Sequence, residues 1–359
     1  MTRLEVITNS TGTTLAELGF TAYFQRQLEL EELQNRAVAR VLGVQRSGLT
    51  LASESGERHV ALDGRWWSLP AEERPTVGDW VVTDGERVLR ALERKSVLKR
   101  MAAGAKVDVQ LVAANVDTVF IVTSCNAEFN PSRLERYLAW VLDARIDAVL
   151  VLTKADLAAD PDHYRSAARE LRSDLCIELV NACDEATLGG VRAWCLPGQT
   201  LALLGSSGVG KSTLVNTLSA EARQTTQAIR EDDAHGRHTT TDRSLHRLAG
   251  GAWLLDSPGM RELALAGAEI GMATLFADLD ELASRCRFSD CAHRGEPGCA
   301  IESALAAGTL DERRLDNYRK LQREQARTRE TLTERHRRVR AFAKRIRRAN
   351  KERTRRAPP

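Results

Sequence analysis

The sequence predicts a multidomain protein in which a small β-barrel precedes an α/β domain, and a helical metal-binding segment follows them. Short alternating apolar stretches separated by turn residues mark residues 36–100. After Val107, longer apolar runs alternate with helical stretches, which is typical of a buried, mostly parallel sheet. Three cysteines and a histidine cluster between residues 286 and 299. At 359 residues the chain is too long for one core, because a domain usually holds roughly 100–200 residues.

The barrel prediction rests on the stretches AVARVLGV, HVALDG, DWVVTDG and RVLRALER between residues 36 and 100. Their spacing favours a small barrel of the OB type, which often binds RNA. Residues 1–35 carry apolar positions at near-helical spacing and predict a helical lead-in. Three tryptophans, Trp66, Trp67 and Trp80, are candidates for stacking on RNA bases, and packing in the barrel core or rim is the alternative.

The α/β domain is predicted over residues 107–275. Its expected strands are VDTVFIVT, IDAVLVLT, LCIELV and TLALLG, and its expected helices include Ser132 to Arg145 and Pro161 to Ser173. Residues 276–330 follow as the metal-binding segment. From about Leu310 the chain is highly charged and has no Gly or Pro before Pro358, so we expect a mostly exposed helix there.

Charge is distributed unevenly along the chain. Residues 335–359 contain 12 Lys or Arg and one acidic residue, so the rest of the chain, with 40 basic and 48 acidic residues, is net −8. The tail at 331–359 therefore predicts contact with a polyanion such as RNA, the alternative being a solvated basic helix without function. No apolar run approaches a membrane span, and no secretory signal is evident at the start. We expect a cytoplasmic protein without a membrane partner.

A phosphate-binding loop is the strongest motif. The apolar strand LALLG leads into the pattern GxxxxGK[ST], and a helical stretch follows it, which is the context that this loop requires. Backbone N–H groups of such a loop surround phosphates, the lysine reaches the outer phosphates and the last hydroxyl faces Mg²⁺. The residues predicted to bind nucleotide are Gly205, Ser206, Ser207, Gly208, Val209, Gly210, Lys211, Ser212 and Thr213.

Two further segments are candidates for sensing the γ-phosphate. Asp256-Ser-Pro-Gly259 ends an apolar strand, where an Asp can hold the Mg²⁺ shell and a Gly can contact the γ-phosphate. Taken alone, this short motif could be an ordinary turn. Upstream, Gly236-Arg-His-Thr-Thr-Thr241 is polar, and one of Thr239, Thr240 or Thr241 is expected to close on Mg²⁺. We assign Thr240 to that role, with the other two left open.

Guanine recognition is predicted from Thr153-Lys154-Ala155-Asp156 at the end of the strand AVLVL. The Asp156 carboxylate can accept hydrogen bonds from guanine N1–H and the exocyclic amine, which adenine lacks. The alternative is an Asp that caps a helix. The usual motif begins with Asn, so base contact by Thr153 is expected to be weaker. Asn181 and Ala182 follow the next strand and are weaker candidates for supporting the base.

A structural zinc site is predicted from Cys286-x4-Cys291-x-His293-x5-Cys299. Three thiolates and one imidazole without a spare carboxylate describe a closed tetrahedral site. The alternative, four unrelated side chains, is disfavoured by the clustering. The other cysteines, Cys125, Cys176, Cys183 and Cys195, are interpreted as ordinary buried thiols.

The motif order is unusual, because the base-recognition motif precedes the phosphate loop. Cutting a GTPase domain after its DxPG segment and joining the old ends gives this order while preserving the sheet. With this order and the Cys/His spacing, the chain resembles the ribosome small-subunit-dependent GTPase A (RsgA/YjeQ) family over about residues 36–325. The resemblance implies an OB-fold, a circularly permuted GTPase domain and a zinc domain, with GTP hydrolysis stimulated by the small ribosomal subunit and its rRNA.

Met260 stands where many GTPases carry the glutamine that orients the attacking water. We therefore expect slow hydrolysis of GTP to GDP by the protein alone, with His238 as a candidate to orient water or else an ordinary loop histidine. Two other functions stay open: a GTP-dependent switch acting on another RNA, such as tRNA or a large-subunit precursor, and a nucleotide-gated RNA-binding module without turnover. A monomer that does not bind DNA is the simplest expectation.

Overall fold

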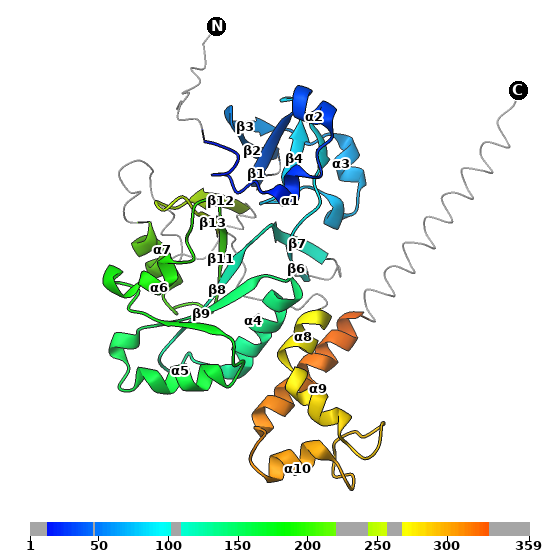
Figure 1. Cartoon of the computed structure of the whole chain (residues 1–359), viewed down its shortest axis with the longest axis vertical. Coiled ribbons are helices and arrows are strands. Elements are labelled where there is room, and N and C mark those ends of the chain that lie inside the picture. Colours follow the sequence, from blue (N-terminus) through cyan, green and yellow to red (C-terminus); the bar gives the residue numbers. More distant parts are fainter. Residues whose placement is uncertain (1–12, 46, 102–108, 220–242, 257–267, 330–359) are drawn as a thin grey trace, which may run out of the picture. The chain divides into compact units, whose positions relative to one another are not determined.

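The computed structural model describes residues 13–45, 47–101, 109–219, 243–256 and 268–329 (Figure 1). The chain divides into two compact units, which are considered separately. The first comprises Met1–Lys99, Leu111–Leu263 and Ile270–Leu275, and the second comprises Arg100–Gln110, Ala264–Glu269 and Phe276–Pro359. Among the described residues, no helix is both long and apolar enough to cross a membrane.

Five strands and two short helices form the N-terminal part of the first unit, which we call the five-strand subdomain. The strands are β1 (Ala37–Gln45), β2 (Gly48–Ser53), β3 (Gly56–Val60), β4 (Trp80–Thr83) and β5 (Val88–Ala91), with α3 (Gly64–Ser68) and η1 (Ala71–Glu73) between β3 and β4. They are ordered β3-β2-β1-β4-β5, with antiparallel pairing throughout. Their inward side chains, including Val41, Leu49, Leu51, Val81 and Trp66, make one apolar core.

The tryptophans of this subdomain have different environments. Trp80 is buried and packs against Phe20 and Phe24 of the lead-in, with ring centroids 4.9 and 5.8 Å away. Trp66 is also buried, and its indole N–H donates to Val88 O at 3.2 Å. Trp67 alone of the three is half exposed. For Trp66 and Trp80 the structure therefore shows core packing, which was the alternative to stacking on RNA bases.

The central α/β part contains a mixed sheet. Its strands are β8 (Thr118–Ser124), β9 (Asp147–Thr153), β10 (Cys176–Leu179), β11 (Thr200–Leu204), β12 (Arg243–Arg247) and β13 (Trp253–Asp256). The order is β10-β9-β8-β11-β13-β12, and every pair is parallel except the antiparallel β12–β13 pair. Every residue of β8 is buried, because helices or neighbouring strands cover it on both faces.

Helices connect and cover these strands. They are α4 (Pro131–Asp143), η2 (Ala155–Leu157), α5 (Pro161–Arg169), η3 (Glu185–Thr187), α6 (Gly189–Arg192), α7 (Lys211–Leu218) and α8 (Glu269–Leu275). Helix α4 packs against β8 and β9, and α5 packs against β10 (Figure 1). The Asn130 side chain accepts from Arg133 N at 3.0 Å and so caps α4, and Asp160 caps α5 in the same way. A separate pair of strands, β6 (Val97–Met101) and β7 (Val109–Ala114), joins the five-strand subdomain to β8.

The two parts of the first unit share one sheet. Strand β1 pairs antiparallel with β12, with Gly43 opposite Ser244 and Val44 opposite Arg243. The lead-in before β1 contains α1 (Ala22–Gln25) and α2 (Leu30–Asn35). The Trp253 indole donates to Glu17 O at 2.9 Å, so the lead-in also contacts β13. The lead-in therefore packs on both parts.

Arg40 lies at the centre of the seam and is buried. Its guanidinium donates to Leu18 O of the lead-in and to Thr200 Oγ1 at the start of β11. Trp80 and Trp253 flank it, with ring centroids 5.8 and 6.0 Å from Cζ. Burial lowers the pKa of Arg40 to about 10, and the nearby Asp117 carboxylate partly opposes this effect. Arg40 therefore stays charged at neutral pH and joins three segments that are far apart in sequence.

The second unit is mainly helical over residues 276–329, while its residues 100–101 and 109–110 belong to β6 and β7. It contains α9 (Ala277–Ser284), α10 (Ala300–Ala306) and a helix over residues 312–329. Arg314 forms an ion pair with Asp278 at 2.9 Å, and the Phe276 and Tyr318 rings are 5.0 Å apart, so the last helix packs on α9. The helix expected from about Leu310 is present over these residues, and its continuation into the basic tail lies outside the described residues.

Replacing Arg40 tests the seam. Arg40→Met keeps most of the side-chain volume but leaves the buried Leu18 carbonyl and Thr200 hydroxyl without their donor. We expect the first unit to lose about 2–4 kcal/mol of unfolding free energy, since each unsatisfied buried group costs roughly 1–3 kcal/mol. The measurement is urea unfolding followed by tryptophan emission. The exposed Arg36→Met is the matched control and should change stability by less than about 0.5 kcal/mol; equal effects of the two variants would contradict this role for Arg40.

Candidate functional site

The predicted phosphate loop connects β11 to α7. Gly205 has φ 158°, and a Cβ at this position would lie 2.2 Å from Val122 O on the neighbouring strand β8. Only glycine therefore allows the loop to leave the sheet this closely. Gly208 and Gly210 also have positive φ, of 77° and 91°. These conformations turn the backbone into the tight loop that places N–H groups around an anion.

Lys211 is the first residue of α7, and its ammonium group lies against the loop. Its Nζ donates to Gly205 O at 2.8 Å and to Ser206 O at 2.5 Å. Ser212, the next residue, is exposed in the first turn of the helix. A positive charge and a hydroxyl thus lie at the same end of α7, where the helix dipole also favours negative charge.

Thr153 is fully buried beneath the phosphate loop. Its hydroxyl oxygen is 2.6 Å from Val209 O and 3.2 Å from Thr123 O. One hydroxyl hydrogen can serve only one of these carbonyls fully, and the shorter contact is to the phosphate loop. The observed contact of Thr153 is therefore with the loop, while its contact with the base stays a prediction.

Lys154 makes a second connection between the base-recognition motif and the phosphate loop. It adopts φ 57°, a left-handed conformation, and its Nζ donates to Gly208 O at 2.9 Å. Asp156 follows in η2 with its side chain exposed. Ala155 N donates to Val180 O at 3.3 Å and so binds this motif to the end of β10. The contact of the Asp156 carboxylate with guanine stays a prediction.

The segment that contains Asn181 and Ala182 is held by α7. Thr217 Oγ1 donates to Ala182 O at 2.6 Å. The Asn181 side chain accepts from Cys183 N at 3.0 Å, which shapes the turn after β10. Thr217 therefore positions the base-support segment relative to the phosphate helix, a role that the sequence alone did not indicate because Thr217 lies outside every motif.

Asp256 is the last residue of β13 and is exposed. Ser244 of β12 lies opposite it in register, and His246 Nε2 is 3.9 Å from Asp256 Oδ2 and 2.9 Å from Ser244 Oγ. Neither Ser244 nor His246 was a candidate from sequence. The other predicted residues of this region, His238, Thr239, Thr240, Thr241, Gly259 and Met260, lie outside the described residues.

These segments meet at one edge of the sheet. The phosphate loop, the base-recognition motif, Asn181 and Asp256 follow β11, β9, β10 and β13, and these strands are parallel. In open α/β sheets, ligands bind beyond the carboxyl ends of the strands. The predicted nucleotide residues that are described thus form one site, although their order along the chain differs from their order in the sheet.

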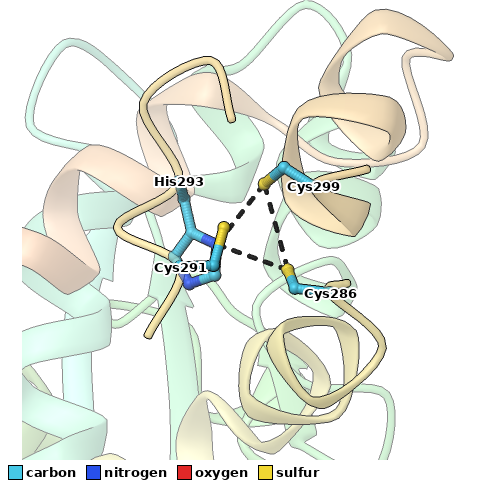
Figure 2. A group of neighbouring side chains, drawn as sticks. All are labelled: Cys286, Cys291, His293 and Cys299. Atoms are coloured by element: carbon cyan, nitrogen blue, oxygen red, sulfur yellow. Dashed lines mark hydrogen bonds between the residues drawn. The ribbon is translucent and has the colours of Figure 1, made fainter. Parts of the chain in front are cut away.

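A second cluster lies in the second unit (Figure 2). The ligand atoms of Cys286, Cys291, His293 and Cys299 all lie within 4.8 Å of one another. His293 Nδ1 is 3.5 Å from Cys286 Sγ and 3.4 Å from Cys299 Sγ, and the two sulfurs are 3.9 Å apart. A tetrahedral zinc ion with bonds of about 2.3 Å to sulfur and about 2.0 Å to nitrogen requires ligand separations of roughly 3.5–3.8 Å. The four residues therefore fit zinc.

Neighbouring groups hold these ligands in place. Arg319 Nη2 donates to His293 O at 2.7 Å, and His293 itself adopts φ 56°. Backbone N–H groups of Ala300 and Glu302 point at Cys286 Sγ and Cys299 Sγ, each at 3.4 Å. Such N–H donors favour thiolates, the form that binds metal. Of the remaining cysteines, Cys125 is buried as expected, but Cys183 is exposed, so the interpretation as a buried thiol is wrong for Cys183.

Comparison with known proteins identifies the family. The model of the RsgA GTPase family matches residues 91–266. The protein named small ribosomal subunit biogenesis GTPase RsgA 2 of Vibrio vulnificus is 47% identical, over 94% of this chain and 95% of its own. The chain belongs to the RsgA GTPase family. The RsgA of Mesorhizobium japonicum is 48% identical, over 89% of this chain and 92% of its own.

Solved structures agree on the fold. The crystal structure of YjeQ from Thermotoga maritima superposes with a TM-score of 0.59 at 24% identity, covering 81% of this chain and 99% of that one. YloQ, described as a circularly permuted GTPase, superposes with a TM-score of 0.57 at 22% identity, covering 81% and 95%. The mixed sheet of this RsgA family member is thus that of a permuted GTPase, as the motif order predicts.

Removing the Thr153 hydroxyl tests its role in this RsgA family member. Thr153→Val keeps the shape but loses the donor to Val209 O, so the phosphate loop is held less firmly. We expect GTP and GDP affinity to fall together by roughly five- to twentyfold, corresponding to about 1–1.7 kcal/mol for one buried hydrogen bond. Fluorescent-nucleotide titration measures this.

The matched control is Thr153→Asn, whose amide has two hydrogens and can donate to both carbonyls. Its affinity should stay within about threefold of the wild type or become tighter. If Thr153→Val instead binds both nucleotides normally but discriminates less against ATP, the side chain acts on the base. Its role in holding the phosphate loop through Val209 O would then be wrong.

Disrupting the metal cluster should affect only the second unit. Cys299→Ser removes one soft ligand, so we expect loss of the bound zinc and rapid hydrogen exchange over residues 276–329, because small metal-bound units depend on the ion for folding. GTP affinity should change less than about twofold, because the nucleotide site has its own apolar core. Normal metal content together with unchanged exchange would contradict the ligand assignment.

Proposed function

We propose that this chain is a GTPase that binds the small ribosomal subunit and hydrolyses GTP to drive a late step of its maturation and its own release. The observation that carries the proposal is the 47–48% identity to proteins named small ribosomal subunit biogenesis GTPases over about nine-tenths of each chain. Hydrolysis of GTP follows from membership of the GTPase family and from the phosphate loop in its strand–loop–helix setting.

In this proposal the nucleotide is held by the residues that meet at the carboxyl edge of the sheet. The loop from Gly205 to Thr213 binds the phosphates, and Lys211 neutralises their charge. Asp156 accepts from guanine, and Lys154 covers the base. Mg²⁺, which neutralises charge on the phosphates when bound, would be held by Ser212, Asp256 and Thr240.

Several assignments beyond the nucleotide site are part of the same proposal. Residues 36–100 are taken as an OB-type domain, which is supported by the strand order β3-β2-β1-β4-β5 and the helix between β3 and β4. Residues 276–330 are taken as a domain that binds one structural zinc ion, and residues 331–359 as an RNA-contacting tail. The proposal also places the chain in the cytoplasm as a monomer that binds neither DNA nor a membrane.

Subunit-stimulated hydrolysis is the mechanistic core of the proposal. Met260 can neither donate nor accept a useful hydrogen bond to water, so the chain alone lacks the usual orienting side chain. Docking on the small subunit would complete the catalytic arrangement, with His238 as the residue that orients water and Gly259 at the γ-phosphate. The GTP-bound and GDP-bound states would then differ in affinity for the subunit, which provides release.

The deciding experiment is multiple-turnover GTP hydrolysis by the full chain, alone and with purified small or large subunits or tRNA, with ATP as the nucleotide control. We expect stimulation by the small subunit on the order of tenfold or more, and little ATP hydrolysis. Lys211→Ala serves as the inactive control, and His238→Ala should lose the stimulation while still binding GTP.

Each other outcome favours a different function. If only tRNA or the large subunit stimulated hydrolysis, the chain would act on an RNA other than that of the small subunit. Tight GTP binding without turnover under any condition would make it a nucleotide-gated RNA-binding module. Full stimulation of His238→Ala would remove that residue from the mechanism but leave the rest of the proposal intact.

A further inference from the structure

An exposed aromatic side chain lies inside the metal-binding loop. Phe288 is between the ligands Cys286 and Cys291, yet 43% of its surface is exposed. Arg287, also exposed, places its guanidinium carbon 5.4 Å from the centre of the Phe288 ring. A planar cation over an aromatic ring is an attractive pair, and here it holds an exposed ring and a positive charge together inside the metal-binding loop.

The backbone fixes the position of this pair. Arg287 N donates to Gly298 O at 3.1 Å, and Cys291 N donates to Phe288 O at 3.3 Å. A Cβ at Gly298 would lie 3.0 Å from Arg287 Cβ and 3.3 Å from its Cδ, so the arginine stem lies flat against the glycine. With a metal bound across Cys286 and Cys291, the loop is closed on both sides of the ring. The pair is therefore preorganised, which reduces the entropy lost on binding.

The charge around Phe288 favours an anionic partner. Residues 285–294 contain three arginines, Arg285, Arg287 and Arg294, and one carboxylate, Asp290. Zn²⁺ with three thiolates and a neutral histidine carries −1, so with Glu296 included residues 285–299 are formally neutral when loaded. The positive charge beside Phe288 is therefore local, on the exposed Arg287 and Arg294. The Glu296 carboxylate accepts from Ala292 N at 3.0 Å and Arg294 N at 2.6 Å and is thus directed inward.

These features together match the recognition of an unpaired nucleic-acid base. Bases displayed in RNA loops stack on aromatic rings and on arginine planes, while nearby cations contact the phosphates. Arg285 is paired with Glu281. An apolar peptide would cover Phe288 equally well, but it would offer no anionic group to the exposed Arg287 and Arg294. The observations therefore favour RNA over protein at this loop.

We propose that Phe288 and Arg287 form a stacking platform for one unpaired base of the RNA that this chain contacts. The proposal rests on the proposed function for the identity of that RNA, the rRNA of the small subunit. It assigns the second unit a base contact in addition to the phosphate contacts expected of its basic side chains.

The test compares side chains that separate stacking from apolar contact. The variants are Phe288→Ala, Phe288→Leu and Phe288→Tyr, and each is measured for binding to small subunits and to small-subunit RNA stripped of protein, with a non-hydrolysable GTP analogue present. We expect Ala and Leu to weaken both affinities about tenfold and Tyr to stay within about threefold, since loss of one base stack is of that size. Arg287→Lys keeps the positive charge but loses the planar guanidinium, so its affinities should lie between those of Phe288→Ala and the wild type.

Controls separate this contact from folding and from the nucleotide site. Every variant should keep one zinc ion per chain, wild-type GTP affinity and wild-type hydrolysis without subunits. Leu196, an apolar residue of the first unit, is even more exposed than Phe288, and Leu196→Ala should bind the RNA as the wild type does.

Three results would overturn the platform. If Phe288→Ala binds the RNA normally, Phe288 makes no contact with it. If Phe288→Leu binds normally and Phe288→Ala does not, the contact is apolar and not a base stack. If the Phe288 variants bind intact subunits weakly but bind the protein-free RNA normally, Phe288 contacts a ribosomal protein. Failure of the proposed function gives a different signature, because the wild-type chain itself would then neither bind small subunits nor be stimulated by them.

Discussion

The antiparallel pairing of β1 with β12, closed by the buried Arg40, is the contact on which the arrangement of the first unit depends. Strand β12 lies in the chain between the predicted threonine loop and β13, which ends at Asp256. The five-strand subdomain is therefore hydrogen-bonded to a strand that sits between two candidate γ-phosphate-sensing segments. Because β12 is paired with β1 at Gly43 and Val44, it cannot shift without moving β1 or breaking this pairing. If these two segments respond to the γ-phosphate as predicted, β12 connects that response to the N-terminal part of the chain.

The site itself depends on sheet geometry more than on chain order. Residues at the carboxyl ends of β9, β11 and β13 meet because these strands are parallel and belong to one sheet, whichever of them comes first in sequence. Contacts between the segments then fix their positions, above all the Thr153 hydroxyl on Val209 O and the Lys154 ammonium on Gly208 O. A permuted order preserves every one of these contacts, and this is why the motif order could be interpreted as a GTPase.

The sequence predicted those parts of the fold that are locally determined. The glycines of the phosphate loop and the continuous apolar runs of β8, β9 and β11 reflect requirements of the backbone and of burial, so they are visible in the residues themselves. Strand β12 was missed, because only Leu245 is buried and the charged Arg243 and Arg247 mask the pattern. Long-range pairing with β1 and β13 holds it, and such pairing has no local signal. The contact of Thr153 was hidden for the same reason, since its partners Val209 and Thr123 are distant in sequence.

The nucleotide site and the metal-binding loop derive their order from different sources. The nucleotide site stands on a large apolar core that includes Phe120, Val151 and Leu201. The segment from Cys286 to Cys299 has no buried apolar side chain of its own among its described residues, apart from Cys299. The predicted zinc ion, when bound, would supply the energy that holds this loop closed. Loss of the metal would release Phe288 and Arg287 from their fixed geometry while leaving the phosphate loop intact, so the proposed RNA contact would be lost without loss of nucleotide binding.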